Sequence, residues 1–252
     1  AVGSSALNSN TTASNNTAVG YYALEANTTG VENTAVGMHS LGNNTTAQSN
    51  SAVGYASLVA NTTGNYNSAL GRHALSSNQT GNRNVGIGYY SLATNTASDN
   101  TAVGYNSLCK NTTGTYNTAL GTLALDANIT TNSNTAIGYA ALGVNIASNN
   151  TAVGTSSLDA NTTGTTNVAV GVAALGANTT ASNNTAVGAS ALTANITGAQ
   201  NTAVGFESLK VNTTGASNVA VGRRTLDANI SGSCNTAIGD NSLTSLTTAS
   251  NI

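Results

Sequence analysis

A 17-residue pattern recurs from one end of this chain to the other. It occurs as AVGYYALEANTTGVENT at Ala18–Thr34 and as AVGFESLKVNTTGASNV at Ala203–Val219. Fifteen copies fill the 252 residues; twelve have 17 residues, and Gly86–Thr101, Ala136–Thr151 and Ala237–Ile252 have 16. A short fixed period of this kind predicts a stack of equivalent structural units. We number the positions of the unit one to seventeen, with the gap of the short copies between positions ten and sixteen.

Three positions never vary among the copies. They are Gly at position three, Leu at position seven and Asn at position sixteen, the last of them Asn251. Position two is always Val, Ile or Leu, and position ten is Asn except at Leu246. The glycine predicts a bend that other residues do not adopt cheaply. The leucine predicts an apolar column, and the asparagines predict ladders of stacked amides.

The period and the composition favour β-structure over helices. A pair of helices needs about 33 residues per repeat, and Gly and Asn recur too often for stable helices. The segment N-T-A-V-G alternates as a strand does, which puts positions seventeen and two on one face and position one on the other. Because Val also occurs at position seventeen, we expect that face to be buried. A second short strand is expected at [AS]-L, and N-T-T-G is expected to form the return corner, with Asn in a left-handed conformation.

Each copy is therefore expected to form one rung of an all-β, parallel β-solenoid of fifteen rungs, in a single array over residues 1–252. Such rungs bury few large side chains, and a core this thin predicts association into a homotrimer or a filament, with a lone solenoid as the alternative to the trimer. The small residues at position one and position six are the expected contact between subunits. The chain begins and ends within the pattern, so we expect it to be a segment of a longer protein.

The composition argues against several partners. Net charge is −2 and only 6% of the residues are charged, so no basic surface for nucleic acid is expected. No apolar run approaches the roughly 18 residues of a membrane span, so membrane insertion is not expected. Cys109 and Cys234 occupy different positions in distant copies, which predicts neither a disulfide nor a metal site. No cofactor motif occurs.

The step N-[TS]-A-[VIL]-G, followed by x-x-[AS]-L and N-T-T-G, resembles repeats of bacterial and phage tail-fibre-type surface proteins. It is also similar to the S-V-A-I-G motif of trimeric autotransporter adhesin heads, which are left-handed parallel β-rolls. The period of 17 is longer than the repeats of those heads. The resemblance covers the whole chain and implies an extracellular, cell-surface or virion fibre that acts as a shaft or an adhesive head.

Catalytic residues are not expected. The two histidines, His39 and His73, both lie at position five, without a carboxylate or nucleophile that recurs beside them. The chain is therefore predicted not to be an enzyme.

Glycosylation is one alternative role. Asn-x-Ser/Thr tripeptides occur at position ten in twelve copies, at Asn10, Asn27, Asn44, Asn61, Asn78, Asn111, Asn128, Asn161, Asn178, Asn195, Asn212 and Asn229. In a secreted eukaryotic protein these would be acceptors of N-linked glycans. The competing interpretation is that N-T-T forms a turn.

Aromatic residues give a second candidate surface. Tyrosines recur at positions four and five, at Tyr21, Tyr22, Tyr55, Tyr89, Tyr90, Tyr105 and Tyr139. Such side chains either contact a cell-surface glycan or a protein receptor, or pack along the surface of the solenoid. Threonines at positions eleven, twelve and seventeen suggest ice binding as a further alternative, although Ile and Val interrupt these columns. The leading prediction is a non-catalytic structural fibre, with a glycosylated filament and an ice-binding solenoid as alternatives.

Overall fold

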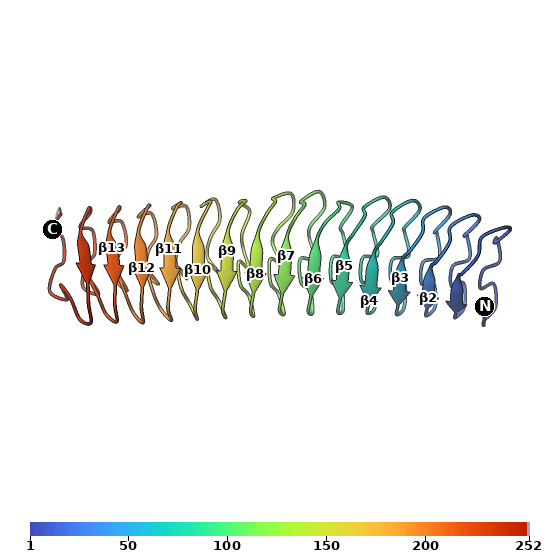
Figure 1. The fold of residues 1–252 in the computed structure, drawn as a ribbon, viewed down its shortest axis with the longest axis horizontal. Helices are drawn as coiled ribbons and strands as arrows, with labels where there is room; N and C mark the ends of the chain where they lie inside the picture. The colour runs from blue at the N-terminus through green and yellow to red at the C-terminus, as the bar shows by residue number, and fades with distance from the viewer. Residues whose placement is uncertain (251–252) are drawn as a thin grey trace. The chain divides into compact units, whose positions relative to one another are not determined.

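The computed structural model describes residues 1–250 and divides into two compact units, Ala1–Thr131 and Asn132–Ile252. Both units are built from the same rung, a three-residue strand followed by a tight bend and two turns (Figure 1). The last asparagine of the position-sixteen column, Asn251, lies outside the described residues.

Every strand consists of positions seventeen, one and two. The first unit contains β1 (Thr17–Val19), β2 (Thr34–Val36), β3 (Ser51–Val53), β4 (Ser68–Leu70), β5 (Val85–Ile87), β6 (Thr101–Val103) and β7 (Thr118–Leu120). The second unit contains β8 (Thr135–Ile137), β9 (Thr151–Val153), β10 (Val168–Val170), β11 (Thr185–Val187), β12 (Thr202–Val204), β13 (Val219–Val221) and β14 (Thr236–Ile238).

The strands of each unit pair in parallel, in the order of the sequence, and in register with the repeat. In β2 and β3, for example, Ala35 faces Ala52 and Val36 faces Val53. In β11 and β12, Ala186 faces Ala203. Each side chain therefore stacks on its equivalent in the next rung, and the predicted parallel β-solenoid is confirmed.

The glycine at position three makes the bend after the strand, as predicted. Gly104 has φ +139°, a conformation that side chains rarely adopt, and a Cβ atom on it would lie 2.5 Å from the carbonyl oxygen of Gly121. The stacked backbones approach each other too closely here for any other residue.

The prediction of a second strand at [AS]-L is wrong. Positions four to nine form turns, and positions five and seven are left-handed, as at Asn106 (φ 50°) and Leu108 (φ 52°). The expected left-handed asparagine of the N-T-T-G corner is also wrong, because the third left-handed column lies at position fifteen, as at Tyr116. The asparagine at position ten turns inward instead.

The core lies between the strand and the turns, and its walls are Ala at position one, Ala or Ser at position six, and Leu at position seven. Leu24 through Leu209 in the position-seven column are fully buried. The prediction that positions seventeen and two are buried is wrong, since the strands have exposed or half-buried residues on both sides of a buried position one. The physical reason is the width of the interior. A Cβ atom placed on Gly86, the one exception to Ala at position one, would lie 3.1 Å from Cγ of Leu75, so only a methyl group fits.

The predicted contact between subunits through small residues is wrong for the same reason. Ala102 at position one and Ser107 at position six are fully buried within their own chain. Oγ of Ser107 donates a hydrogen bond to the carbonyl oxygen of Ala119 at 3.1 Å. These residues are small because they fill the core, so they are not available to another subunit.

Candidate interaction surfaces

The asparagines at position ten form a buried ladder, as predicted. Nδ2 of Asn44 donates to Oδ1 of Asn27 at 2.9 Å and to the carbonyl oxygen of Ala47 at 3.1 Å. Oδ1 of Asn44 in turn accepts from Nδ2 of Asn61 at 2.9 Å. Such an amide joins its own corner to the rung before it, and its buried oxygen and nitrogen are both hydrogen-bonded.

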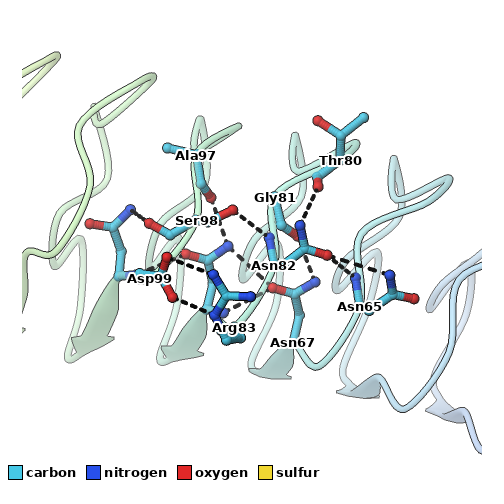
Figure 2. Close-up of polar contacts among 11 residues, drawn as sticks. Asn65, Asn67, Thr80, Gly81, Asn82, Arg83, Ala97, Ser98 and Asp99 are labelled. Atoms are coloured by element: carbon cyan, nitrogen blue, oxygen red, sulfur yellow. Dashed lines mark hydrogen bonds and ion pairs between the residues drawn. The ribbon is translucent and has the colours of Figure 1, made fainter.

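The asparagines at position sixteen form a second ladder. Oδ1 of Asn67 accepts the backbone N–H of Asn84 at 3.0 Å, and Nδ2 of Asn67 donates to the carbonyl oxygen of Gly81 at 2.8 Å (Figure 2). The carbonyl at position thirteen therefore accepts from two asparagines, one in its own rung and one in the preceding rung. The amide columns at positions ten and sixteen together fix the return corner.

A third ladder at position fourteen is not evident from the sequence. The backbone N–H of Asn65 donates to Oδ1 of Asn82 at 2.8 Å, and the N–H of Asn82 donates to Oγ of Ser98 at 2.9 Å (Figure 2). Serine replaces asparagine in this role in other rungs, as at Ser182 and Ser233. Because position fourteen carries different residue types in different copies, a comparison of the copies for identical residues does not reveal this ladder.

Two interruptions of the position-ten ladder have a cause in the sequence. Oδ1 of Asn78 has no partner, because the next rung is one residue short and Nδ2 of Asn95 bonds only to Ala97 within that rung. Oδ1 of Asn229 has no partner either, because the next rung carries Leu246 at position ten. Both oxygens are buried, so each interruption lowers the local stability.

The ladder bears directly on the twelve tripeptides proposed for glycosylation. Apart from the half-buried Asn10, all of their asparagines are fully buried, and their Nδ2 atoms donate hydrogen bonds inside the rung. A glycan on Nδ2 cannot be accommodated there while the rung is folded. Four further Asn-x-Thr tripeptides, which the repeat pattern obscured, do have exposed asparagines: Asn15, Asn43, Asn149 and Asn183.

The outward face of the strands is a regular surface of each unit. It carries an aliphatic residue at position two in every rung, and Thr, Ser or Val at position seventeen. Val53, Leu70 and Leu120 are among the exposed members of the position-two column. We call this surface, positions seventeen and two of each strand, the strand face. With strands spaced about 4.8 Å apart, it extends roughly 30 Å along each unit.

The threonine columns at positions eleven and seventeen differ in the hydrogen bonding of their hydroxyl groups. At position eleven the hydroxyl is engaged, since Oγ1 of Thr45 donates to the carbonyl oxygen of Thr62 at 3.1 Å and Oγ1 of Thr162 donates to that of Thr179 at 2.9 Å. At position seventeen, on the strand face, the threonine hydroxyls bond to no protein group within residues 1–250. The free hydroxyls therefore lie among the aliphatic side chains.

Six of the seven predicted tyrosines lie at positions four and five of the first unit, where their rings make two contact groups, and Tyr139 lies in the second unit. One group is Tyr21 and Tyr22 with His39, and the other is Tyr55, Tyr89, Tyr90 and Tyr105 with His73. The ring centroids of Tyr22 and His39 lie 5.3 Å apart with planes at 11°, and those of Tyr89 and Tyr105 lie 5.5 Å apart with planes at 5°. We call the side chains at positions four and five from Tyr21 to Tyr105 the aromatic corner. Two more exposed tyrosines, Tyr66 and Tyr116 at position fifteen, lie outside it.

Arg72 lies within the aromatic corner. Its guanidinium carbon is 5.5 Å from the ring centroid of Tyr55 and 5.9 Å from that of Tyr89. The neighbouring His73 contacts Tyr55 and Tyr90, with centroids 5.3 and 5.0 Å away. Burial, and then the charge of Arg72, lower the pKa of His73, so this imidazole is neutral at pH 7. Arg72 therefore carries the positive charge at this place.

The other cations are paired. Nε of Arg83 lies 2.6 Å from Oδ1 of Asp99 (Figure 2), and that of Arg223 lies 2.9 Å from Oδ1 of Asp240. Within residues 1–250, five of the six lysines and arginines pair with a carboxylate in this way, whereas Arg72 has no carboxylate oxygen within 4.0 Å.

Both cysteines are free thiols in the single chain. Sγ of Cys109 donates to Oδ1 of Asp126 at 3.0 Å, and Cys234 is exposed. Burial, followed by the hydrogen bond and charge of Asp126, raises the pKa of the Cys109 thiol to about 12. In the described part of the chain no three His, Cys, Asp or Glu residues gather as a metal site would require. Residues 1–250 also contain no helix with the length and apolar character needed to cross a membrane.

Comparisons with protein-family models, with curated proteins and with solved structures found no match for this chain. The repeat and the surfaces described above are therefore the evidence for what the chain does.

Proposed function

We propose that the chain is a non-catalytic structural array that associates with copies of itself through the strand face, as a homotrimer that forms part of an extracellular fibre. The observation that carries this proposal is the aliphatic column at position two. Parallel sheets are normally covered on both faces. Here one side of each sheet covers the core, and the other presents Val, Ile or Leu in every rung.

The regularity of this column supports a packing role. Position two is exposed or half-buried in the single chain, where Ser or Thr would serve equally well, yet it is aliphatic in all fifteen copies. Contiguous apolar surfaces of this kind mark contacts with other molecules. A second copy has the same column at the same spacing, so two strand faces can match rung for rung. The number of three copies follows the resemblance to adhesin heads, as does the extracellular location.

The native mass in solution tests the proposal. Light scattering should give about three times the 24.7 kDa chain mass. Glutamate at Val153 and Val187, on the strand face, should reduce the particle to a single chain. Glutamate at Val144 and Val211, two exposed valines at position nine, should leave the mass unchanged.

Two results would contradict the proposal: a single-chain mass for the unaltered protein, or an unchanged mass for the Val153 and Val187 variant. A dimer or a larger particle that the strand-face variant dissociates would leave self-association in place and make the trimer wrong.

Ice binding is the second candidate, because the hydroxyls at position seventeen are free and lie on a flat, weakly charged face. Val85, Val168 and Val219 interrupt this column. A strand face covered by other copies cannot also bind ice, so the two proposals exclude each other at this surface. Thermal hysteresis in a single-chain particle would favour ice binding, and its absence at high protein concentration would remove it.

A further inference from the structure

The aromatic corner combines residues that are scarce elsewhere in the chain. Six of the nine tyrosines and both histidines lie at positions four and five between Tyr21 and Tyr105. The corresponding positions of the second unit carry Tyr139 and Phe206 as their aromatic residues. The rung does not require aromatic side chains at these positions, because Ser, Thr, Ala, Val and Asp occupy them in other copies. The concentration in one unit therefore calls for an explanation other than folding.

Arg72 is held in an orientation suited to an anion. Its guanidinium group lies between Tyr55 of the preceding rung and Tyr89 of the following rung, at similar distances from both rings. Contact with the two rings is made through the π-faces of the tyrosines, so the N–H groups of the guanidinium remain available to a ligand. Two parallel N–H groups match the two oxygens of a carboxylate. The side chain is exposed, so a ligand can reach it.

A ligand at Arg72 would contact the hydroxyl groups of the surrounding tyrosines, because the faces of their rings are already in contact with other side chains. Tyr89 and Tyr105 are stacked on each other, and the ring of Tyr55 is occupied by Arg72. These three side chains are nevertheless between 40% and 51% exposed, and each phenol group both donates and accepts hydrogen bonds. The ligand that fits them is rich in hydroxyl groups.

The charge of the aromatic corner limits the ligand further. One unpaired cation over six rungs is too little for a densely charged polyanion such as a nucleic acid, whose binding depends on several phosphate contacts. It suits a chain in which acidic groups are sparse.

We propose that the aromatic corner binds an acidic polysaccharide, with the carboxylate of one sugar on the edge of Arg72 and the hydroxyls of its neighbours on the tyrosines. This inference is independent of self-association, since the corner lies beyond the position-three glycine and off the strand face. A glycan-binding site on an otherwise structural array would make the array adhesive by itself.

Binding of hyaluronate, a linear glycan with a carboxylate on every second sugar, tests the proposal in the full chain at physiological ionic strength. Arg72→Gln should weaken binding at least tenfold, because it removes a charged two-fold hydrogen bond. Arg72→Lys should bind with intermediate strength. Arg223→Gln is the matched control: Arg223 also lies at position four, but it is paired with Asp240, so binding should not change. Circular dichroism should show an unaltered fold in all three variants.

Two further ligands test whether binding needs both the acidic group and the sugar. Dextran is a neutral glycan, and polyglutamate is an acidic peptide. The proposal predicts much weaker binding of both. Absence of hyaluronate binding, or equal binding by the Arg72→Gln variant, would overturn it. Polyglutamate binding that matches hyaluronate and depends on Arg72 would also overturn it, in favour of an acidic peptide.

Discussion

At the scale of single residues, the fold depends on a few positions where only one side chain fits. Gly at position three allows a close approach between rungs, and Ala at position one fills a space that admits one methyl group. Leu at position seven is buried although its backbone is left-handed, a conformation that costs a residue with a Cβ atom about 1–2 kcal/mol. Its burial in the rungs from Leu24 to Leu226 offsets that cost.

Substitution at Gly104 tests this close approach. Gly104→Ala should lower the free energy of unfolding by at least about 2 kcal/mol, because it combines an unfavourable φ with a clash against Gly121. Gly42→Ala is the control, since Gly42 has an ordinary φ and the nearest atom to an added Cβ is 3.3 Å away. Urea midpoints measure both. Equal midpoints would show that the rungs can move apart at position three.

The reactivities of the Cys109 and Cys234 thiols can be compared within the same protein. A pKa of about 12 leaves roughly one Cys109 thiol in ten thousand ionised at pH 8, and only the thiolate is nucleophilic. Iodoacetamide should therefore modify the exposed Cys234 much faster than Cys109 in the folded protein, with the rates followed by peptide mass spectrometry. Asp126→Ala should accelerate Cys109, because it removes the carboxylate that raises the pKa. Equal rates in the unaltered protein would contradict this account.

At the scale of the rung, stability comes as much from amide ladders as from apolar contacts. Positions ten and sixteen are polar and fully buried in most rungs, and each asparagine there bonds to the neighbouring rung. Buried polar groups are stabilising only when they are fully bonded. The ladders therefore specify the register of the repeat.

Alanine substitutions at the adjacent residues Asn43 and Asn44 test how much the ladder contributes to stability. Only Asn44 belongs to the ladder, so the difference between the two variants is the effect of the ladder and not of replacing an asparagine. Asn44→Ala removes three hydrogen bonds and leaves Oδ1 of Asn27 buried without a partner, so it should destabilise the fold by about 3 kcal/mol. Asn43→Ala is the control, since Asn43 is exposed at position nine and should change stability by less than about 0.5 kcal/mol. Urea midpoints and hydrogen exchange in the neighbouring rungs would show the difference. Similar losses for both variants would mean that the ladder adds little.

The sequence was sufficient to predict the rung, but not which side of the strand faces inward. Alternation defines two faces, and we expected the larger Val column to be the buried one. The interior is already filled by Leu75 and its equivalents, so the methyl group of Ala turns inward and Val turns outward. That outcome depends on the width of the rung, which is set by the left-handed turn at positions five to seven and is not evident from periodicity.

The candidate sites were predictable only in part. Recurrence at positions four and five placed the tyrosines in one column, and ring contacts join six of them in two groups, one with Tyr21 and Tyr22 and one from Tyr55 to Tyr105. The isolation of Arg72 from carboxylates was not predictable, because it depends on which acidic residues occupy the adjacent rungs. The burial of the position-ten tripeptides follows from the ladder, which the sequence did suggest. The exposed tripeptides at Asn15, Asn43, Asn149 and Asn183 were visible in the sequence and were missed because they do not lie at position ten.

At the scale of the whole molecule, the low charge shapes both stability and association. With a net charge of −2 there is little repulsion between copies, and association through an aliphatic face should depend weakly on salt. Only eight acidic residues are present, so few groups couple folding to pH.

Acid should have little effect on folding. The pKa values of Asp99 and Asp240 are lowered by hydrogen bonds from Arg83 and Arg223, so these carboxylates stabilise the fold above the unfolded value of about 4, and that contribution is lost as the pH falls through their folded values. Burial raises the pKa of Asp159, so protonation there acts in the opposite sense. Circular dichroism and urea midpoints should be similar at pH 7 and pH 3. Cooperative unfolding between pH 5 and pH 3 would contradict this prediction.

The central claim is that the strand face is covered in the native particle. Val187 on this face and Val211 at position nine are both 37% exposed in the single chain, so they form a matched pair. Hydroxyl-radical footprinting with peptide mass spectrometry measures the oxidation of each. The account predicts that Val187 is strongly protected relative to Val211 in the native particle, and that the difference disappears on unfolding. Equal oxidation of the two valines in the native particle would contradict it.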